Sequence, residues 1–290
     1  MKSDLKTKLS MNITVISDTH GLHDELHFDY EGDMLIHAGD ITEYGTEEEV
    51  IDFLKWFSKQ PFTYKIFIAG NHDLFFEECN AAKKKLIPKD IIYLQNSGTV
   101  IEGLKIWGSP VTPYFLGMAF NEREGKAIQK VWKKIPADTD ILITHGPPKG
   151  ILDGGIGCAE LLSRVESIQP KYHCFGHAHG YNGSNYVQQT VYLNGAMVNT
   201  PDLLKNEALR IQGRPITVYY KPYTKEEIIF LSNLNRELKI AEKQIVDRAT
   251  VLLNLAVCKL ENKDEFTTDF EIEAAVEYYL RRKEDPVHAV

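Results

Sequence analysis

The feature that most restricts the fold of this chain is a repeated pairing of a short apolar run with a polar turn. Five such runs, rich in β-branched or aromatic residues, are each followed at once by a turn that carries Asp, Asn or His. They are Ile13–Ile16 before Ser17-Asp18-Thr19-His20, Met34–His37 before Ala38-Gly39-Asp40, Lys65–Ala69 before Gly70-Asn71-His72-Asp73, Ile141–Thr144 before His145-Gly146-Pro147-Pro148, and Tyr172–Phe175 before Gly176-His177-Ala178-His179. Helical stretches lie between several of the runs, and such alternation is typical of an α/β layered domain.

Other parts of the chain show helix and strand patterns as well. Within Glu47–Ser58 the apolar residues Val50, Phe53, Leu54 and Phe57 fall at i, i+3, i+4 and i+7, which places them on one face of a helix. The Glu102–Gly103 step predicts a hairpin turn. Further helices are expected near Leu74, at Asn121–Lys134 and at Ala159–Val165, and further strands at Ile91–Leu94, Thr99–Ile101, Lys105–Trp107, Val191–Leu193 and Ile216–Tyr220.

The composition changes close to Pro222, which predicts a domain boundary. Glycine is absent after Gly213, and leucines from Leu231 to Leu255 keep a spacing close to a heptad, interrupted by Arg248. We predict a leader at 1–11, a core domain at 12–222 and a helical C-terminal extension at 223–290. The extension either packs as an intramolecular helix pair or forms the seam of a homo-oligomer.

Charge and cysteine usage exclude several classes of protein. The net charge of −8 argues against general binding of duplex nucleic acid, which needs a basic surface. The cysteines at 79, 158, 174 and 258 include no CxxC pair, so they are interpreted as reduced thiols, with Cys174 in the core. The N-terminus lacks an apolar signal segment, and no apolar run reaches the ~20 residues that cross a membrane. A cytoplasmic location is therefore expected.

The polar turns predict a metal site. In open α/β sheets ligands bind beyond the carboxyl ends of the strands, so the turns would converge if the five strands share a sheet. The converging donors are only oxygen and nitrogen atoms, which suits Mn, Fe or Zn. These donors belong to Asp18, His20, Asp40, Asn71, His145, His177 and His179.

This set is too large for one ion, so it predicts two divalent cations. Asp40 is the natural bridge, because a carboxylate has two oxygens and a negative charge to place between two cations. A water held between the metals would ionise to the hydroxide nucleophile. His72, beside Asn71, could then protonate the leaving alkoxide or hold a phosphate oxygen, with Asp73 orienting it. Any one of these motifs could be structural if taken alone; Asn71, for instance, could cap a helix near Leu74.

The remaining histidines and aromatic residues have other interpretations. His37 and His173 lie within apolar runs and are expected to be buried. His23, His27 and His288 are expected to be solvated, although His23 is close enough to the site to contact substrate. Trp107, Tyr114, Phe115 and Tyr181 either form an aromatic wall that stacks on a nucleobase or serve hydrophobic packing, and Tyr181 has the strongest case because it follows His179-Gly180.

The motifs DxH, GD, GNHD, the histidine of THG, and GHxH, in this order, resemble the calcineurin-like metallophosphoesterase superfamily. The resemblance covers about Asn12 to Tyr220. Within the superfamily, the stretches HAGDITEYGTEEEV, YKIFIAGNHDL, IWGSPVTPYF, TDILITHGPP and GCAELL are similar to the metallophosphoesterase-domain (MPPED) branch.

The resemblance implies a fold and roles for individual residues. The implied fold is a four-layer αββα sandwich. The first metal would be held by Asp18, His20, Asp40 and His179, and the second by Asp40, Asn71, His145 and His177, with His72 as the acid that contacts phosphate. Some animal members lack one histidine of GHxH, whereas His177 and His179 are both present here.

Several functions are compatible with these features. The leading hypothesis is a phosphodiesterase that acts on a small substrate such as a cyclic nucleotide. The alternatives within enzymes are a phosphomonoesterase, a phosphoprotein phosphatase or a nuclease. Outside enzymes, the metal site could stabilise a scaffold that binds a partner through its helical extension.

Overall fold

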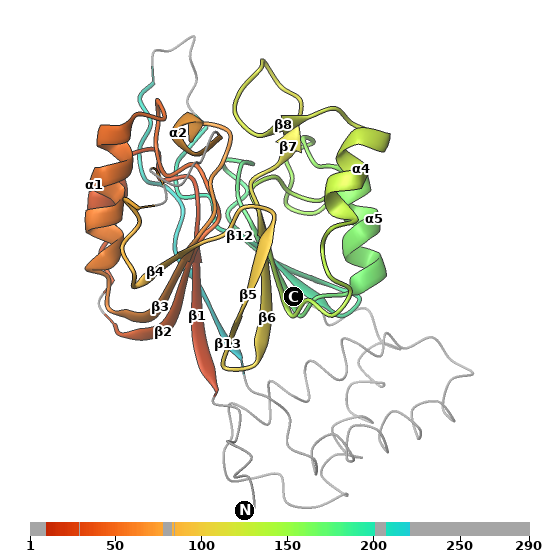
Figure 1. Cartoon of the computed structure of the whole chain (residues 1–290), viewed down its shortest axis with the longest axis horizontal. Coiled ribbons are helices and arrows are strands. Elements are labelled where there is room, and N and C mark those ends of the chain that lie inside the picture. Colours follow the sequence, from red (N-terminus) through yellow and green to blue (C-terminus); the bar gives the residue numbers. More distant parts are fainter. Residues whose placement is uncertain (1–9, 29, 78–82, 84, 201–206, 221–290) are drawn as a thin grey trace, which may run out of the picture. The chain divides into compact units, whose positions relative to one another are not determined.

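The computed structural model describes residues 10–28, 30–77, 83, 85–200 and 207–220 (Figure 1). The chain divides into two units, Met1–Pro222 and Tyr223–Val290. The predicted helical extension, its leucine stripe, Cys258 and His288 belong to the second unit and lie outside the described residues, as do Cys79 and most of the leader. None of the described helices combines the length and apolar character needed to cross a bilayer.

Two β-sheets form the centre of the first unit. The first sheet has the order β13 (Ile216–Tyr220), β1 (Met11–Ile16), β2 (Gly32–His37), β3 (Phe62–Phe67) and β4 (Ile91–Tyr93), and only β13 is antiparallel to its neighbour. The second has the order β11 (Gly183–Val187), β12 (Thr190–Asn194), β10 (Tyr172–Phe175), β9 (Ile141–Thr144), β6 (Leu104–Ser109) and β5 (Ser97–Ile101), with antiparallel pairing only at its two ends.

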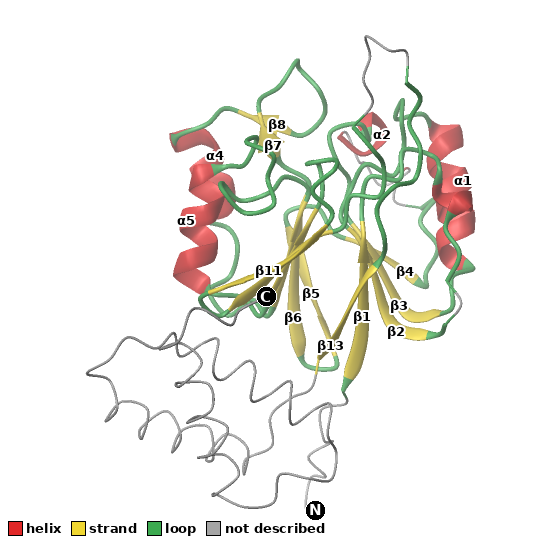
Figure 2. Ribbon diagram, turned by 180° about the vertical axis from the view of Figure 1, so that it is seen from behind, coloured by secondary structure: helices red, strands yellow, loops and turns green. Residues whose placement is uncertain are grey.

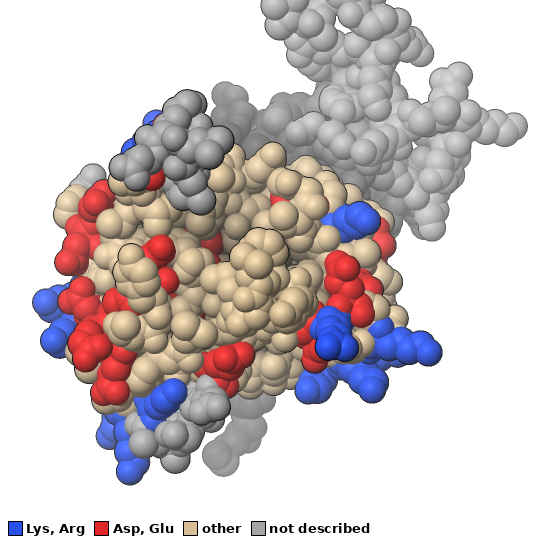
Figure 3. Space-filling view, turned by 90° about the horizontal axis from the view of Figure 1, so that it is seen from above, with Lys and Arg blue, Asp and Glu red and all other residues tan. Residues whose placement is uncertain are grey.

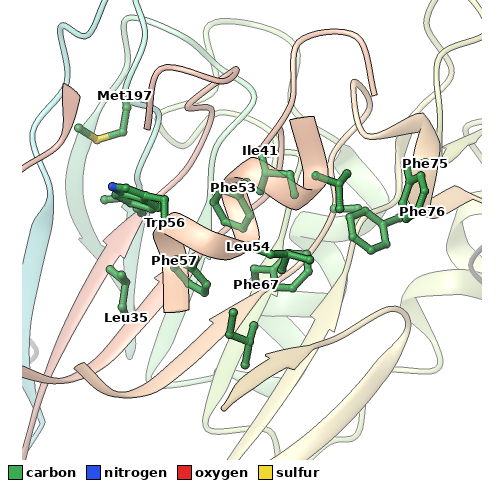
Figure 4. Packing of buried hydrophobic residues seen from close by; sticks show 14 of the residues in the cluster. Leu35, Ile41, Phe53, Leu54, Trp56, Phe57, Phe67, Phe75, Phe76 and Met197 are labelled. Carbon is green, nitrogen blue, oxygen red and sulfur yellow. The ribbon is translucent and has the colours of Figure 1, made fainter. Parts of the chain in front are cut away.

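Helix α1 (Glu47–Ser58) covers the outer face of the first sheet, as its apolar stripe predicts. It begins with a capping box, in which the Thr46 hydroxyl accepts from the Glu49 N–H and the Glu49 carboxylate accepts from the Thr46 N–H. Its buried face packs on Leu35 and Phe67, and Figure 4 shows these side chains meeting between the helix and the sheet. The short helices η1 (His23–Glu25) and α2 (Leu74–Glu77) follow the loops of β1 and β3.

Two further apolar layers complete the sandwich. Ile13, Val15 and Ile36 of the first sheet meet Ile141 and Ile143 of the second in a layer between the sheets. On the far side of the second sheet, Leu142 and Phe175 pack against α4 (Lys126–Trp132) and α5 (Ala159–Ile168). Neighbouring residues of a strand enter different layers, because side chains alternate across a sheet. The layers run helix, sheet, sheet, helix, which confirms the αββα fold (Figures 1 and 2).

The structure answers one condition that the sequence left open and corrects one expectation about the elements. The five site-bearing strands do not share one sheet: β1, β2 and β3 belong to the first sheet, whereas β9 and β10 belong to the second. The helix expected at Asn121–Lys134 begins only at Lys126, because Asn121–Glu122 forms strand β8 beside β7 (Thr112–Pro113), where the Asn121 amide donates to the Thr112 hydroxyl. Strands β7 and β11 were not expected from the sequence.

Candidate metal centre

The five polar turns meet where the carboxyl ends of the two sheets adjoin. The loops after β1, β2 and β3 carry Asp18 and His20, Asp40, and Asn71, and the loops after β9 and β10 carry His145, and His177 with His179. Figure 2 shows these loops gathered above both sheets. The donors therefore converge because the site-bearing strands of both sheets have their carboxyl ends at the same end of the domain, and not because they share a single sheet.

Asp18, His20 and His179 form the first group of donors. His179 Nε2 lies 3.2 Å from Asp18 Oδ1 and 3.3 Å from His20 Nε2. The Asp18 carboxylate also accepts from the His177 backbone N–H, at 2.9 Å to Oδ2. Asp18 and His20 are buried, while His179 is partly exposed. Asp18 and His20 belong to the first sheet and His179 to the second, so this group joins the two sheets.

Asp40, Asn71, His145 and His177 form the second group. His145 Nε2 lies 3.1 Å from Asp40 Oδ2 and 3.0 Å from Asn71 Oδ1. The ring centroids of His145 and His177 are 5.0 Å apart, and one ligand atom each of Asp40, His145 and His177 lie within 4.8 Å of one another. This group also combines residues of both sheets.

Asp40 lies between the two groups. Its Oδ2 atom is 3.1 Å from His145 Nε2 in the second group and 3.6 Å from His20 Nε2 in the first. Its Oδ1 atom accepts the His72 backbone N–H at 2.8 Å. One buried carboxylate is thus shared by both groups, which is the position that a bridging ligand needs.

The backbone at these positions is unusual and closely packed. Asp18, His20, Asp40 and His177 all have positive φ, between 45° and 66°, which is uncommon for residues other than glycine. Such conformations cluster at functional sites, where the surrounding structure enforces them. Gly70 is equally constrained, because a Cβ there would lie 2.7 Å from His145 Cε1 and closer still to Asp40 Oδ1. A side chain at position 70 would therefore occupy the space that the donor side chains of Asp40 and His145 fill.

Hydrogen bonds fix how two of the histidines face the centre. His145 Nδ1 donates to the Ala38 carbonyl at 2.9 Å, and His20 Nδ1 donates to the Glu43 carboxylate at 2.7 Å. In each ring Nε2 is then the atom that faces the other donors. Such outer partners orient metal-bound histidines in known sites. Glu43 was not among the residues singled out from the sequence, although its place three residues after Asp40 puts it in the same loop.

The donor set fits divalent cations. Two ligands that are about 2.1 Å from one ion are about 3.0 Å apart at a right angle and about 3.4 Å apart at the tetrahedral angle. The separations of 3.1, 3.2 and 3.3 Å between donor atoms in the two groups fall in this range. Nitrogen and oxygen donors without thiolates suit Mn, Fe or Zn. The residues present therefore fit two metals.

Residues 11–181, more than half of the chain, match the family model described as calcineurin-like phosphoesterase. The chain belongs to the calcineurin-like phosphoesterase family. The family is metal-dependent and hydrolytic, which agrees with the donor groups of this phosphoesterase. The resemblance seen in the ordered motifs is thereby confirmed.

The phosphoesterase is also similar to curated proteins. It is 40% identical over 211 residues to metallophosphoesterase domain-containing protein 1 of Homo sapiens, a match that covers 63% of this chain and 64% of the human protein. It is 38% identical over 228 residues to UPF0046 protein K07C11.7 of Caenorhabditis elegans, covering 72% of this chain and 75% of that protein. The match thus spans slightly less than two thirds of the human relative.

Electrostatics in the phosphoesterase site oppose the effect of burial. Burial would raise the pKa of Asp40, but the positive charges of His145 and His20 hold that pKa well below its usual value. Conversely, burial would lower the pKa of His145, but Asp40 and Asp18 raise it to about 9. Among the described residues, the ion-pair partners of Asp18 and Asp40 are all histidines. The negative charges of these two buried carboxylates are therefore balanced by neighbouring histidines.

His72 lies at the mouth of the site, and its neighbours correct one expectation. His72 Nδ1 donates to the Glu43 carbonyl at 2.8 Å, and the ring lines the adjoining cavity. Asp73 does not orient it. Instead the buried Asp73 carboxylate accepts from the backbone N–H groups of Gly70 and Thr42, at 2.7 and 2.9 Å, and ties the Asn71 loop to the Asp40 loop. Burial and the Asp40 charge raise the pKa of Asp73 to about 6.

The burial of the other histidines was predicted correctly in some cases and wrongly in one. His37 and His173 are buried as expected, with Nε2 bonded to the hydroxyls of Thr19 and Thr144, respectively. His27 is exposed, as expected. The expectation that His23 is solvated is wrong: it is 1% exposed, because its ring packs against Phe53 and Trp56 of α1.

The aromatic residues do not form one continuous wall. Trp107 is partly buried and packs against the apolar layer beneath α4 and α5, which agrees with the packing alternative. Tyr114 and Phe115 are 63% and 58% exposed, in the loop between β7 and β8. Tyr181 is 50% exposed and lies against Gly154. The buried Cys174 confirms the expectation for that residue.

A cavity of about 690 Å³ opens beside the metal centre. Its lining residues are His20, Gly21, Leu22, His23, Glu43, Tyr44, Glu49, Asp52, His72, His179, Glu207 and Leu209. Within the part of the chain that the structure describes, the lining contains carboxylates and histidines but neither lysine nor arginine. Figure 3 looks onto this end of the molecule and shows lysine and arginine side chains towards the edges of the view.

Proposed function

We propose that this phosphoesterase hydrolyses small phosphodiesters with two divalent cations bound at the candidate metal centre. The observation that carries the proposal is the position of Asp40, whose Oδ2 lies 3.1 Å from His145 Nε2 and 3.6 Å from His20 Nε2. One carboxylate between two sets of nitrogen and oxygen donors is the arrangement that a two-metal centre requires.

The donor groups define which residues hold each cation. Asp18, His20, Asp40 and His179 would hold the first, and Asp40, Asn71, His145 and His177 the second. Bound divalent cations would supply a water that ionises near neutral pH, together with positive charge for the phosphate oxygens. Glu43 and the Ala38 carbonyl keep the rings of His20 and His145 turned towards the centre. The backbone N–H of His72 donates to Asp40 Oδ1. Asp40 Oδ2 is therefore the oxygen that remains available between the two donor groups.

His72 is the proposed proton donor to the leaving oxygen. Its Nδ1 atom already donates to the Glu43 carbonyl, so Nε2 is the ring atom free to exchange a proton with substrate. The ring is about one quarter exposed, at 28%, and lines the cavity in which a substrate would lie. A positioned acid of this kind contributes about 10²–10⁴-fold to the rate.

The charge of the cavity favours diesters over monoesters. A phosphodiester carries one negative charge, whereas a monoester carries close to two at neutral pH. Among the described residues, the cavity lining contains Glu43, Glu49 and Asp52 but no lysine or arginine to add to the positive charge that the two cations would supply. Like charges in a partly desolvated cleft repel strongly. The same argument disfavours long polyanions such as nucleic acids.

Exposed aromatic side chains near the site suit a substrate with an aromatic group. Tyr114 follows β7, in a loop that is bound to the metal centre, because the Ala119 N–H donates to the Asn71 carbonyl at 3.1 Å. Tyr181 follows His179 by two residues. A ring in the substrate, such as a nucleobase, could stack on either tyrosine.

The test is turnover by the purified full-length chain after loading with Mn, Fe, Ni or Zn. We expect hydrolysis of bis-p-nitrophenyl phosphate at a higher kcat/KM than of p-nitrophenyl phosphate, and we expect activity on 2′,3′- or 3′,5′-cyclic nucleotides. His72→Ala should lower kcat by about 10²–10⁴-fold without loss of bound metal. Absence of turnover with all four metals would refute the proposed function, and a preference for the monoester would indicate a phosphomonoesterase.

A further inference from the structure

A second cluster of metal-type donors lies outside the centre described above. It consists of His23 and Asp24 of η1 and Asp52 of α1. One ligand atom from each lies within 4.8 Å of the other two. None of the three belongs to the donor groups of the proposed two-metal centre.

His23 is the feature of this cluster that points to a ligand. It is 1% exposed, yet neither of its ring nitrogens has a hydrogen-bond partner. His37 and His173, also buried, each leave only one nitrogen without a partner, so His23 differs from the other buried histidines in the described part of the chain. A buried polar group without a partner costs about 1–3 kcal/mol, and native structures seldom leave one unsatisfied.

One of the two unpartnered ring nitrogens faces the Asp52 carboxylate. His23 Nε2 is 3.5 Å from Asp52 Oδ2, which is too long for a good hydrogen bond. It is close to the separation of about 3.4 Å between two ligands of one tetrahedral ion. The carboxylates of Asp24 and Asp52 are exposed to solvent, so an ion could enter from outside, and His23 and Asp52 both line the cavity.

The chemistry of the three donors selects a divalent cation. One imidazole nitrogen and two carboxylate oxygens form the mixed set that Mn or Zn accepts, with waters completing the coordination. Burial lowers the pKa of His23 below its usual value, although Asp24 and Asp52 act in the opposite direction. The ring is then neutral at physiological pH, which is the form that binds metals.

We propose that His23, Asp24 and Asp52 form a third divalent-cation site, separate from the two-metal centre. The site would join η1, which follows Asp18 and His20 in the chain, to α1, which follows Asp40 and Glu43. A cation there would hold the two loops that supply the proposed bridging carboxylate and the first donor group. It would therefore stabilise the arrangement of the centre without contributing a ligand to it.

The test is the number of Mn²⁺ ions bound by the full-length chain, counted by electron paramagnetic resonance of free Mn²⁺ during a titration. We expect three ions per chain in the native protein and two in Asp52→Asn. Glu48→Gln is the matched control, because Glu48 lies one turn from Asp52 on the same exposed helix surface and loses the same charge. It should retain three ions. His23→Phe keeps the ring packing against Phe53 and Trp56 and should also bind two.

The outcomes separate this proposal from the proposed function. Two ions in the native protein, or an equal number in Asp52→Asn and Glu48→Gln, would overturn the third site even if the protein hydrolyses diesters. Three ions in the native protein and in Glu48→Gln, with two in Asp52→Asn, would establish the site even if every phosphoester remained intact. If His23→Phe fails to fold, the comparison of Asp52→Asn with Glu48→Gln decides the matter alone.

Discussion

Gly70→Ala tests the metal centre without replacing any proposed ligand. A Cβ at this position would lie 2.5 Å from the Asp40 backbone nitrogen and 2.7 Å from His145 Cε1, and nearer still to Asp40 Oδ1. Ordinary contacts are about 3.5 Å, so Asp40 and His145 would each have to move by about 1 Å. Both neighbours are buried and belong to opposite sheets, so neither can move freely.

The displacement should reduce both activity and metal binding. A shift of about 1 Å at a catalytic centre lowers the rate about 100-fold, which corresponds to about 2.7 kcal/mol of transition-state stabilisation. Overpacking should also lower the free energy of unfolding by about 1–3 kcal/mol. The measurements are kcat/KM for bis-p-nitrophenyl phosphate, bound Mn²⁺ per chain, and urea unfolding.

Gly146→Ala provides the matched control. Gly146 follows His145 directly, but a Cβ there would meet nothing closer than 3.4 Å, the distance to Thr112 Cγ2. This variant should retain metal and lose less than threefold in kcat/KM. The reasoning fails if Gly70→Ala keeps native metal content and activity, or if the two variants are impaired equally.

Three further predictions concern the outer hydrogen bonds, the core and acid stability. Glu43→Gln should weaken Mn²⁺ binding about 10–100-fold, because it weakens the bond that orients His20, and competition with a chelating dye measures the change; unchanged affinity would argue against this role. Phe53→Ala should lower the unfolding free energy by about 3–5 kcal/mol, because Phe53 is fully buried, whereas the exposed Val100→Ala should change it by less than about 0.5 kcal/mol in the same urea titration. Burial lowers the pKa of His173 from 6.5 to about 3, so between these pH values the unfolded chain binds a proton that the folded chain does not, and stability falls as pH decreases. In His173→Gln the decrease between pH 7 and pH 4 should be smaller by about 3 kcal/mol; equal decreases in both proteins would contradict the assignment.

The positions of the strands and site loops could be predicted because both depend on local sequence. An apolar β-branched run followed by Gly, Asp, Asn or His specifies a buried strand and its loop without reference to distant residues. Ile141–Thr144 and Tyr172–Phe175 became strands with these bounds. The assignment of strands to sheets could not be predicted this way, because an apolar run does not specify its neighbour. The two sheets were expected from the resemblance to the family, and the apolar runs alone left open which strands belong to which sheet.

The residues that were missed or misplaced depend on tertiary packing. Glu43 resembles any exposed loop carboxylate in the sequence, and only the fold brings it to 2.7 Å from His20 Nδ1. His23 is followed by Asp24 and Glu25 in the sequence but is covered by aromatic rings of α1. Trp107 occupies the outer face of its strand, and the sequence does not reveal whether that face meets helices or substrate.

Both donor groups combine residues from the two sheets, and this has a consequence for engineering the protein. The separation of the donors depends on how the sheets are stacked, and therefore on the apolar side chains between them, such as Ile36, Ile68 and Ile143. A change in side-chain volume in this layer would shift the donors on one sheet relative to the donors on the other. In the proposed two-metal centre, metal affinity would be tunable from positions that touch neither ion, and a series of Ile→Val variants in that layer, titrated with Mn²⁺, would measure how steeply affinity follows the stacking.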